Sequence, residues 1–325
     1  MTLQTRNKTV VLAFSGGQDS TTVLGYLLSA GYSVIALSLY YGQRHFAEVQ
    51  AAKRVVAYFR SVYREAENYL THEVLELPEN TLMGSSPLLS GSKQPLEQYA
   101  DHASLPGGLE KTFVPMRNQL FLTIAANRAY ASDTNIVATG VCQEDFGGYP
   151  DCTDRFIRAF VHASSIGTFT GTDGAPDTLR VLTPLMFATK AETVALALDD
   201  HRYTYQALGF SHTSYDGNYP PTGRDHATLL RAKGFEEAGV PDPLVLRAFA
   251  EGVMFYPETS NYSPEVITHT VDRLEQRGEV ISPYLIEARR LAREPEDERT
   301  MRQSRKDFFA EELDATFAGV ARDED

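Results

Sequence analysis

A regular alternation of strand-like and helix-like segments, which starts at Lys8, constrains the fold of this chain more than any other feature. Short apolar runs that read as buried strands are followed by longer segments with the apolar spacing of a helix. Strands that alternate with helices in this way form a parallel sheet covered on both faces. We therefore expect an α/β domain with a five-stranded parallel sheet. The expected strands are residues 8–14, 33–41, 72–78, 135–141 and 180–185, and the expected helices are residues 21–31, 45–59, 117–132, 154–165 and 189–201.

The chain is long enough for more than one unit. Its 325 residues, 42% of them hydrophobic, suffice for one large core or two modest ones, at roughly 150 residues per domain. After Pro243 the sequence changes to charged helical stretches and ends in the acidic tail "ARDED". We expect a main domain at residues 1–243 and a helical C-terminal extension at residues 244–325, which is a candidate partner or dimer surface with frayed last residues.

A long irregular segment, residues 80–111, interrupts the alternation with glycine, serine and proline. Loops of this length inside a compact domain are functional or disordered. We interpret the segment as a mobile lid over a site.

Charge and composition narrow the classes of function. The formal net charge of −13 argues against a broad contact with nucleic acid, so a small substrate is favoured. The apolar runs are far shorter than the ~20 residues that cross a bilayer, and the N-terminus lacks a signal-peptide layout. Cys142 and Cys152 are the two cysteines, which suits a reducing compartment and packing roles better than a nucleophile. We expect a cytoplasmic protein without a membrane partner.

A glycine pair separates the first expected strand from the first expected helix, in "AFSGGQDSTTVL" at residues 13–24. Glycines let a backbone bend around an anion, and the amides at a helix N-terminus attract it. No lysine follows the glycines, so this is not the GxxxxGK[ST] loop. An isolated Gly-Gly is more often an ordinary turn, but the whole string SGGQDS resembles the PP-loop of the ATP pyrophosphatases. That resemblance implies phosphate contacts from Ser15, Gly16, Gly17, Gln18, Asp19 and Ser20.

Four further motifs follow in the sequence: "LYYGQRH" at 39–45, "FVPMRNQLFL" at 113–122, "TGVCQEDFGGYPDC" at 139–152 and "TPLMFATKAET" at 183–193. With them the chain resembles one family, the 7-cyano-7-deazaguanine synthases (QueC-like) of queuosine biosynthesis, over roughly residues 8–245. The resemblance implies a Rossmann-like PP-loop domain (adenine nucleotide alpha hydrolase-like), a homodimer, and ATP and Mg²⁺ as cofactors. The implied reaction converts 7-carboxy-7-deazaguanine and ammonia into 7-cyano-7-deazaguanine through an acyl adenylate and an amide.

The side-chain chemistry of the motif residues is consistent with binding of an anionic nucleotide and substrate. Arg117 opens a helix after the irregular segment, where an arginine can hold a carboxylate or phosphate through paired hydrogen bonds, although a surface arginine is the plain alternative. Lys190 at a helix start is disfavoured by the helix dipole, which points to an anionic partner. We expect Arg117, Lys190 and Asp19 to be catalytic. Lys190 is also expected to reach the phosphates of the nucleotide. Arg44 and Gly140 are further candidates for nucleotide binding, and His45 for binding the nucleotide or the substrate.

An acidic loop follows the fourth expected strand, at the sheet edge where open α/β sheets bind ligands. Its carboxylates can read the donor groups of a guanine-like ring or hold Mg²⁺. On its own the loop is equally well explained as a solvated acidic turn. With the resemblance, the substrate-binding candidates are Arg117, Asn118, Glu144, Asp145, Tyr149 and Asp151.

The turn-rich loop at residues 211–235 departs from the family. The resemblance implies four zinc-binding cysteines there, spaced C-x7 or 8-C-x2-C-x2-C, but this chain has Ser214, Thr222, Asp225 and Thr228. Hydroxyl groups are poor zinc ligands, so a structural zinc is not expected and we interpret 211–235 as a degenerate zinc knuckle. The loop would then be held by the backbone restriction of its prolines and by hydrogen bonds of its polar side chains. A site rebuilt from His212, Asp225 and His226 is the alternative.

Three rival functions remain at this point. The enzyme could stop at the 7-amido product or conjugate the deazaguanine to another amine, for example on a protein in a defence system. The chain could be a nucleotide-binding protein without catalysis, but Asp19 and Lys190 are both present. An RNA-modifying PP-loop enzyme fits the acidic charge poorly.

Overall fold

Five parallel strands form the centre of the protein in the computed structural model, which describes residues 8–43, 47–78, 80–105, 108–143, 148–169 and 178–294. The strands are β1 (Thr9–Ala13), β2 (Ser33–Tyr40), β3 (Leu70–Glu76), β4 (Ile136–Thr139) and β5 (Arg180–Leu182). Their order is β3-β2-β1-β4-β5, and every neighbouring pair is parallel. The predicted α/β class and the five predicted strands are confirmed.

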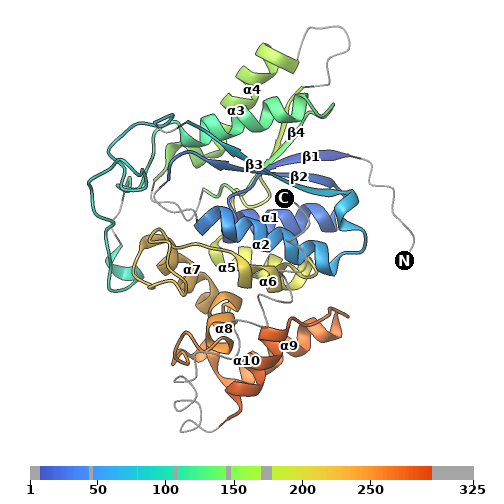
Figure 1. Ribbon diagram of the computed structural model, residues 1–325, viewed down its shortest axis with the longest axis vertical. Helices are drawn as coiled ribbons and strands as arrows, with labels where there is room; N and C mark the ends of the chain where they lie inside the picture. The colour runs from blue at the N-terminus through green and yellow to red at the C-terminus, as the bar shows by residue number, and fades with distance from the viewer. Residues whose placement is uncertain are drawn as a thin grey trace.

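Helices cover both faces of this sheet (Figure 1). On β1, Val10 and Leu12 belong to the core beneath α1 (Gln18–Ser29) and α2 (Ala47–Val62), whereas Val11 belongs to the core beneath α3 (Arg117–Tyr130) and α4 (Asp154–Ser164). Successive side chains of a strand point to opposite faces, so a strand covered on both faces must be apolar throughout. This explains the continuous apolar runs in the sequence.

The helices after β5 lie below α1 and α2 in Figure 1. The single predicted helix at 189–201 consists of α5 (Lys190–Ala195) and a π-helical stretch, Leu196–Asp200. The others are α6 (Thr204–Ala207), α7 (His226–Glu237), α8 (Pro243–Ala250), α9 (Pro264–Gln276) and α10 (Pro283–Ala292). Among the residues that the structure describes, no helix is long and apolar enough to span a membrane.

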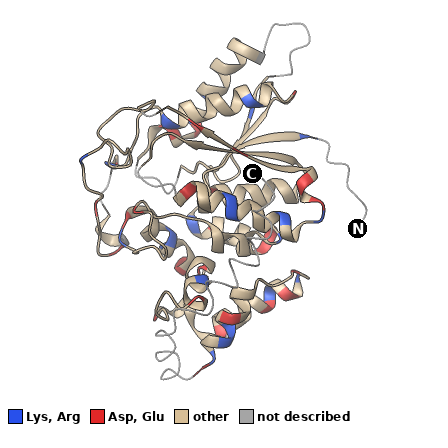
Figure 2. Ribbon diagram, viewed as in Figure 1, with Lys and Arg blue, Asp and Glu red and all other residues tan. Residues whose placement is uncertain are grey.

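The described part of the C-terminal extension is helical, as expected. Its residues Leu246, Val271 and Leu285 are buried in the same core as α1 and α2. The Tyr284 hydroxyl donates to the Gln206 carbonyl at 2.7 Å, which joins α10 to α6. Acidic and basic residues both occur along α9 and α10 (Figure 2), and Arg289 pairs with Asp272 and Glu275. The division at residue 243 stays a prediction, and residues 295–325 lie outside the described part.

The irregular segment before α3 packs as a layer of its own. Leu82, Leu88 and Leu89 are buried with Tyr41 and Val114 in a small third cluster. The Tyr99 amide donates to the Arg224 carbonyl at 2.8 Å, which ties the segment to the loop before α7. The segment therefore covers one end of the sheet; its movement as a lid stays a prediction.

Candidate active site

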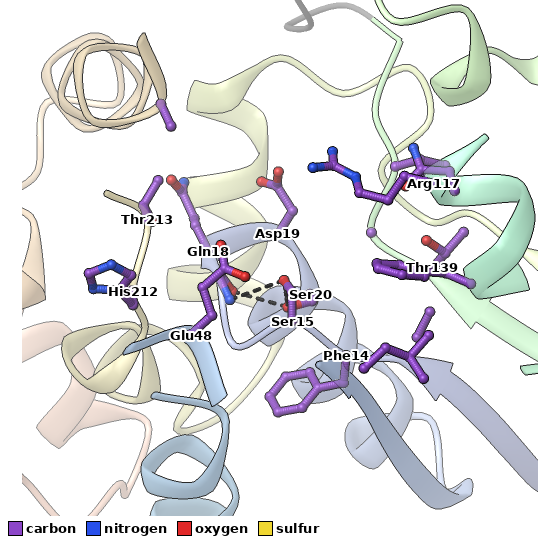
Figure 3. Close-up of a pocket in the computed structure, with 18 of the residues that line it drawn as sticks. Phe14, Ser15, Gln18, Asp19, Ser20, Glu48, Arg117, Thr139, His212 and Thr213 are labelled. Atoms are coloured by element: carbon purple, nitrogen blue, oxygen red, sulfur yellow. Dashed lines mark hydrogen bonds between the residues drawn. The ribbon is translucent and has the colours of Figure 1, made fainter. Parts of the chain in front are cut away.

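A cavity of about 290 Å³ lies at the carboxyl ends of β1, β2 and β4. Ligands of open α/β sheets bind at this edge, where neighbouring loops diverge. Figure 3 shows side chains from several elements directed into it. Its described walls include most of the predicted site residues: Ser15, Gly17, Gln18, Asp19, Ser20, Arg117, Asn118, Gly140, Tyr149 and Lys190.

The phosphate loop is the segment that joins β1 to the first turn of α1, residues 14–20, and it contains the string SGGQDS. Two close backbone approaches shape its surroundings. Gly16 has φ +79°, and a Cβ there would lie 2.5 Å from the Ala52 amide nitrogen, so another residue would not fit. A Cβ on Gly140 would lie 2.9 Å from the Ser20 amide nitrogen, because the end of β4 passes directly against the start of α1. The Ser15 and Ser20 hydroxyls lie 3.1 Å apart (Figure 3). The loop thus presents hydroxyls and the N-terminus of α1 to the cavity, as anion binding requires.

Lys190 and Asp19 form an ion pair on the cavity wall. The Lys190 ammonium donates to both Asp19 carboxylate oxygens, at 2.9 and 2.8 Å. The two side chains are 11% and 22% exposed, so the pair is largely shielded from water. Asp19 supplies the anionic partner of this lysine within the protein.

Arg117 begins α3 and reaches into the cavity beside Tyr41, Tyr149 and Tyr215. Burial alone lowers the pKa of Arg117, but the neighbouring tyrosines, Tyr41 first, outweigh it and leave the pKa raised. The guanidinium is therefore a permanent cation in a half-buried place, which suits it to hold an anion.

Asn118 and Asp151 fix the first turn of α3. The Asn118 backbone amide donates to Asp151 Oδ2 at 3.3 Å, and its carboxamide donates to Oδ1 at 3.2 Å. Burial raises the pKa of Asp151, while the hydrogen bonds from Asn118 lower it. Asp151 is not among the described cavity-lining residues, so the structure gives it a positioning role. Its predicted substrate contact stays a prediction, and Arg44, His45, Glu144 and Asp145 lie outside the described residues.

Tyr149 belongs to a chain of polar contacts that crosses from the acidic loop to α7. Its hydroxyl lies 2.5 Å from Thr112 Oγ1, and Thr112 donates to Glu110 Oε2 at 2.9 Å. The other Glu110 oxygen lies 3.0 Å from His226 Nδ1. The chain links the irregular segment to two walls of the cavity.

The two cysteines have packing roles. The Cys142 thiol donates to the Ala188 carbonyl at 3.0 Å. Burial raises the pKa of Cys152 to about 12, so it is a thiol at neutral pH. Cys152 therefore lacks the thiolate character that a nucleophile needs.

Hydrogen bonds connect the positions where the family resemblance places cysteines. Asp225 Oδ2 accepts from the Ser214 hydroxyl at 3.0 Å and from the Thr228 hydroxyl at 3.1 Å. Asp216 joins the network, because it accepts from the Thr222 hydroxyl at 2.7 Å and also from Ser214. This agrees with the interpretation that hydrogen bonds hold the loop.

The histidines of this loop have other partners. The His212 ring lies 2.8 Å from the Ser214 carbonyl and its backbone amide donates to Gly16 at 2.9 Å, which anchors the loop to the phosphate loop. His226 pairs with Glu110. Within the described residues, no group of three or more histidine, cysteine, aspartate or glutamate side chains is placed to hold a metal ion. His212, Asp225 and His226 therefore do not form the rebuilt site.

Sequence reasoning missed several cavity-lining residues. Tyr41 and Gln43 lie in the "LYYGQRH" motif, which was the available signal. Glu48 was read as part of an ordinary amphipathic helix, and His212 was considered only as a metal ligand. Tyr215 follows Ser214 in the loop at residues 211–235. All five line the cavity.

Known proteins resemble this chain over most of its length. The family described as queuosine biosynthesis protein QueC matches residues 8–239. The 7-cyano-7-deazaguanine synthase of Gloeobacter violaceus is 43% identical over 73% of this chain and 95% of that protein. The synthase of Chromobacterium violaceum is 39% identical over 76% and 97%, respectively. Among solved structures, the predicted subunit of a tRNA methyltransferase from Methanocaldococcus jannaschii aligns over 58% of this chain and 74% of that chain, at 16% identity and a TM-score of 0.35, which is too weak to add to the assignment. The chain belongs to the QueC family of queuosine biosynthesis proteins.

Proposed function

We propose that this protein converts 7-carboxy-7-deazaguanine and ammonia into 7-cyano-7-deazaguanine at the expense of ATP. The observation that carries the proposal is one cavity whose walls hold the phosphate loop, the Lys190–Asp19 pair and the Arg117 guanidinium. These groups suit the binding of a nucleotide and an anionic substrate next to each other. The relatives named 7-cyano-7-deazaguanine synthase support this choice of substrate.

The phosphate loop and Lys190 would bind the ATP phosphates. The hydroxyls of Ser15 and Ser20 and the amides at the start of α1 supply hydrogen bonds, and Lys190 supplies positive charge. ATP would compete with Asp19 for this lysine.

Arg117 would hold the substrate carboxylate next to the α-phosphate. A carboxylate oxygen forms a bond to the α-phosphorus, and the bond from that phosphorus to pyrophosphate breaks. Fixed cations that face the developing charge accelerate such a step. The protein needs no covalent intermediate for it.

Ammonia then attacks the carbonyl carbon of the acyl adenylate and forms a C–N bond. The bond from that carbon to the adenylate oxygen breaks, AMP departs with this oxygen, and the nitrogen loses a proton to give the amide. In a second round the amide oxygen attacks ATP and pyrophosphate departs again. Loss of AMP and the remaining nitrogen protons leaves the nitrile. Ammonia as the amine, and a homodimer as the working state, are parts of this proposal.

The residues present fit a magnesium ion. Nucleotide sites hold Mg²⁺ through one or two carboxylates together with phosphate oxygens and water. Asp19, inside the phosphate loop and on the cavity wall, matches that donor set. When bound, Mg²⁺ neutralises charge on the departing pyrophosphate.

Mass spectrometry of the products tests the proposal. The protein is treated with a chelator and incubated with ATP, Mg²⁺, ammonium and 7-carboxy-7-deazaguanine, and its circular dichroism is checked first. The nitrile is the expected product. The amide alone, or a conjugate with an added amine, would favour the rival end points. Folded protein that releases no pyrophosphate would overturn the proposal.

A further inference from the structure

Gln18 carries two buried polar atoms that the protein leaves unsatisfied. Its side chain is 3% exposed and lines the cavity. Within the described residues, neither the carboxamide oxygen nor the carboxamide nitrogen has a hydrogen-bond partner. Native proteins rarely leave such atoms unpaired, because each costs its desolvation free energy. A ligand with one donor and one acceptor side by side would satisfy both atoms.

Glu48 brings a carboxylate to the same cavity from the first turn of α2. Figure 3 shows that Glu48 and Arg117 enter the cavity from different elements. Burial raises the pKa of Glu48, while the charge of Arg117 and a hydrogen bond from Gln43 lower it. A carboxylate repels the phosphates of a nucleotide but accepts from two adjacent N–H groups. The Glu48 carboxylate therefore favours a ligand that presents an edge with two N–H donors.

The ring of 7-carboxy-7-deazaguanine offers both patterns on adjacent edges. Its N1–H and 2-amino group are neighbouring donors, and its N3 and N9–H are a neighbouring acceptor and donor. The C7 carboxylate lies on the other side of the ring. One cavity that holds a carboxylate, a carboxamide and a separate arginine matches these three features.

We propose that Glu48 accepts from N1–H and the 2-amino group of the substrate ring, and that the Gln18 carboxamide pairs with N3 and N9–H. This inference rests on the proposed function and assigns the ring specificity of that site. The Gln18 backbone amide remains at the N-terminus of α1, so the same residue can bind phosphate through its main chain. Because N9–H exists in the free base and not in its nucleoside, Gln18 also selects the base.

Binding measurements with altered rings test the two assignments separately. Dissociation constants are measured by titration calorimetry for 7-carboxy-7-deazaguanine, its analogue without the 2-amino group, and its 9-methyl analogue. The proteins are the unchanged chain, Glu48→Gln, Gln18→Met, and the control Glu67→Gln, whose side chain is exposed and outside the cavity. ATP affinity, measured in parallel, reports whether each variant is folded.

The unchanged chain and the control should prefer the full ring over each analogue by roughly ten- to a hundredfold, as expected for hydrogen bonds to buried polar groups. Glu48→Gln should lose the preference for the 2-amino group and keep that for N9–H. Gln18→Met should lose the preference for N9–H and keep that for the 2-amino group. ATP affinity should stay within about twofold in both variants.

Other results would overturn the inference. Variants that keep both preferences would show that other groups read the ring. A Glu48→Gln protein that needs more Mg²⁺ and still prefers the 2-amino ring would place Glu48 on the metal. If Gln18→Met loses ATP affinity and keeps the N9–H preference, its carboxamide serves the nucleotide. An unchanged chain that binds ATP but none of the three rings would overturn the proposed function as well, which separates the two failures.

Discussion

Lys190 and Asp19 are 171 positions apart in the sequence, yet the lysine ammonium lies within 2.9 Å of both carboxylate oxygens of the aspartate. The contact joins the start of α5 to the phosphate loop. It holds the lysine charge at the cavity before any ligand is bound. The two motifs therefore form one site in the folded protein.

Lys190→Gln should reduce pyrophosphate release by roughly a hundredfold or more, because a fixed charge that stabilises the transition state is lost. It should also lower the melting temperature, since Asp19 would lose its ion-pair partner. A coupled pyrophosphate assay and a thermal melt measure the two effects. Lys233→Gln is the control, because Lys233 is 41% exposed and pairs with Glu237 on the surface of α7. Activity within threefold of the unchanged chain would exclude Lys190 from catalysis.

Met116→Gly should be at least as stable as the unchanged chain. Met116 has φ +66°, a left-handed conformation that costs a side chain about 1 kcal/mol and costs glycine almost nothing. Its side chain is 58% exposed, so its removal sacrifices little buried area. The relief is offset in part by the greater entropy of an unfolded glycine. Met116→Val should be less stable by more than about 1 kcal/mol, because a branched side chain fits this conformation poorly.

A second exposed methionine controls for this effect. Met83 is 78% exposed and is not among the residues with positive φ. Met83→Gly should therefore bring no relief of strain. Chemical denaturation of the four proteins gives the comparison, and a Met116→Gly protein less stable than Met83→Gly would contradict the strain at residue 116.

Asp225→Asn should gain stability relative to the unchanged chain as the pH rises from about 4, the ordinary pKa of an aspartate, to neutral pH. Burial raises the pKa of Asp225, although hydrogen bonds from Thr228 and Ser214 lower it. A carboxyl group with a raised pKa in the folded state stabilises the fold at low pH, and this contribution is lost as the pH rises through that pKa. Asparagine stays neutral and removes the dependence. Melting temperatures of both proteins, measured across this pH range, show whether the stability of Asp225→Asn rises relative to that of the unchanged chain.

The alanine variant separates charge from helix capping. Asp225 Oδ1 accepts from the Thr228 amide at 3.1 Å and caps α7. Asparagine can keep this bond through its carbonyl, but Asp225→Ala loses it and should be less stable by about 1–2 kcal/mol at every pH. A constant difference between Asp225→Asn and the unchanged chain would show that the carboxylate is not the titrating group.

The sequence predicted the sheet well because its signal is local. The central strand β1 is buried on both faces and is therefore apolar along its middle, as Val10, Val11 and Leu12 illustrate. Gly16 and Gly140, which the family resemblance singled out, lie at backbone approaches that admit no side chain, whereas the phosphate contacts implied by that resemblance stay a prediction.

Glu48 and Asp151 show what local patterns cannot predict. Glu48 lies four and seven positions before the buried Ala52 and Val55, on the apolar face of α2. It lines the cavity because the start of α2 approaches the phosphate loop, where Gly16 meets Ala52. The Asp151 carboxylate accepts a hydrogen bond from Asn118, which precedes it by 33 positions, a contact that the acidic loop alone did not indicate. Both outcomes depend on how distant segments meet, and no single-segment periodicity encodes that.

The loop at residues 211–235 contains no cysteine, but its hydrogen-bonded positions lie close enough for introduced cysteines to form a metal site. A variant with Ser214→Cys, Thr222→Cys, Asp225→Cys and Thr228→Cys should bind one Zn²⁺ per chain. Ser214 and Thr228 converge on the same Asp225 oxygen, at 3.0 and 3.1 Å, and Thr222 joins them through Asp216. Side chains this close can place thiolates around one zinc ion at about 2.3 Å from the metal.

Zinc that binds only the folded variant must raise its melting temperature. Added Zn²⁺ should therefore shift the melt of the four-cysteine protein upward and leave that of the unchanged chain in place. Metal analysis after gel filtration gives the stoichiometry, and a variant that keeps Thr222 should bind more weakly, because its site lacks one thiolate. If the four-cysteine protein is folded and binds no zinc, the hydrogen-bonded cluster does not superimpose on the family's metal site. The resemblance over residues 211–235 would then need a different alignment.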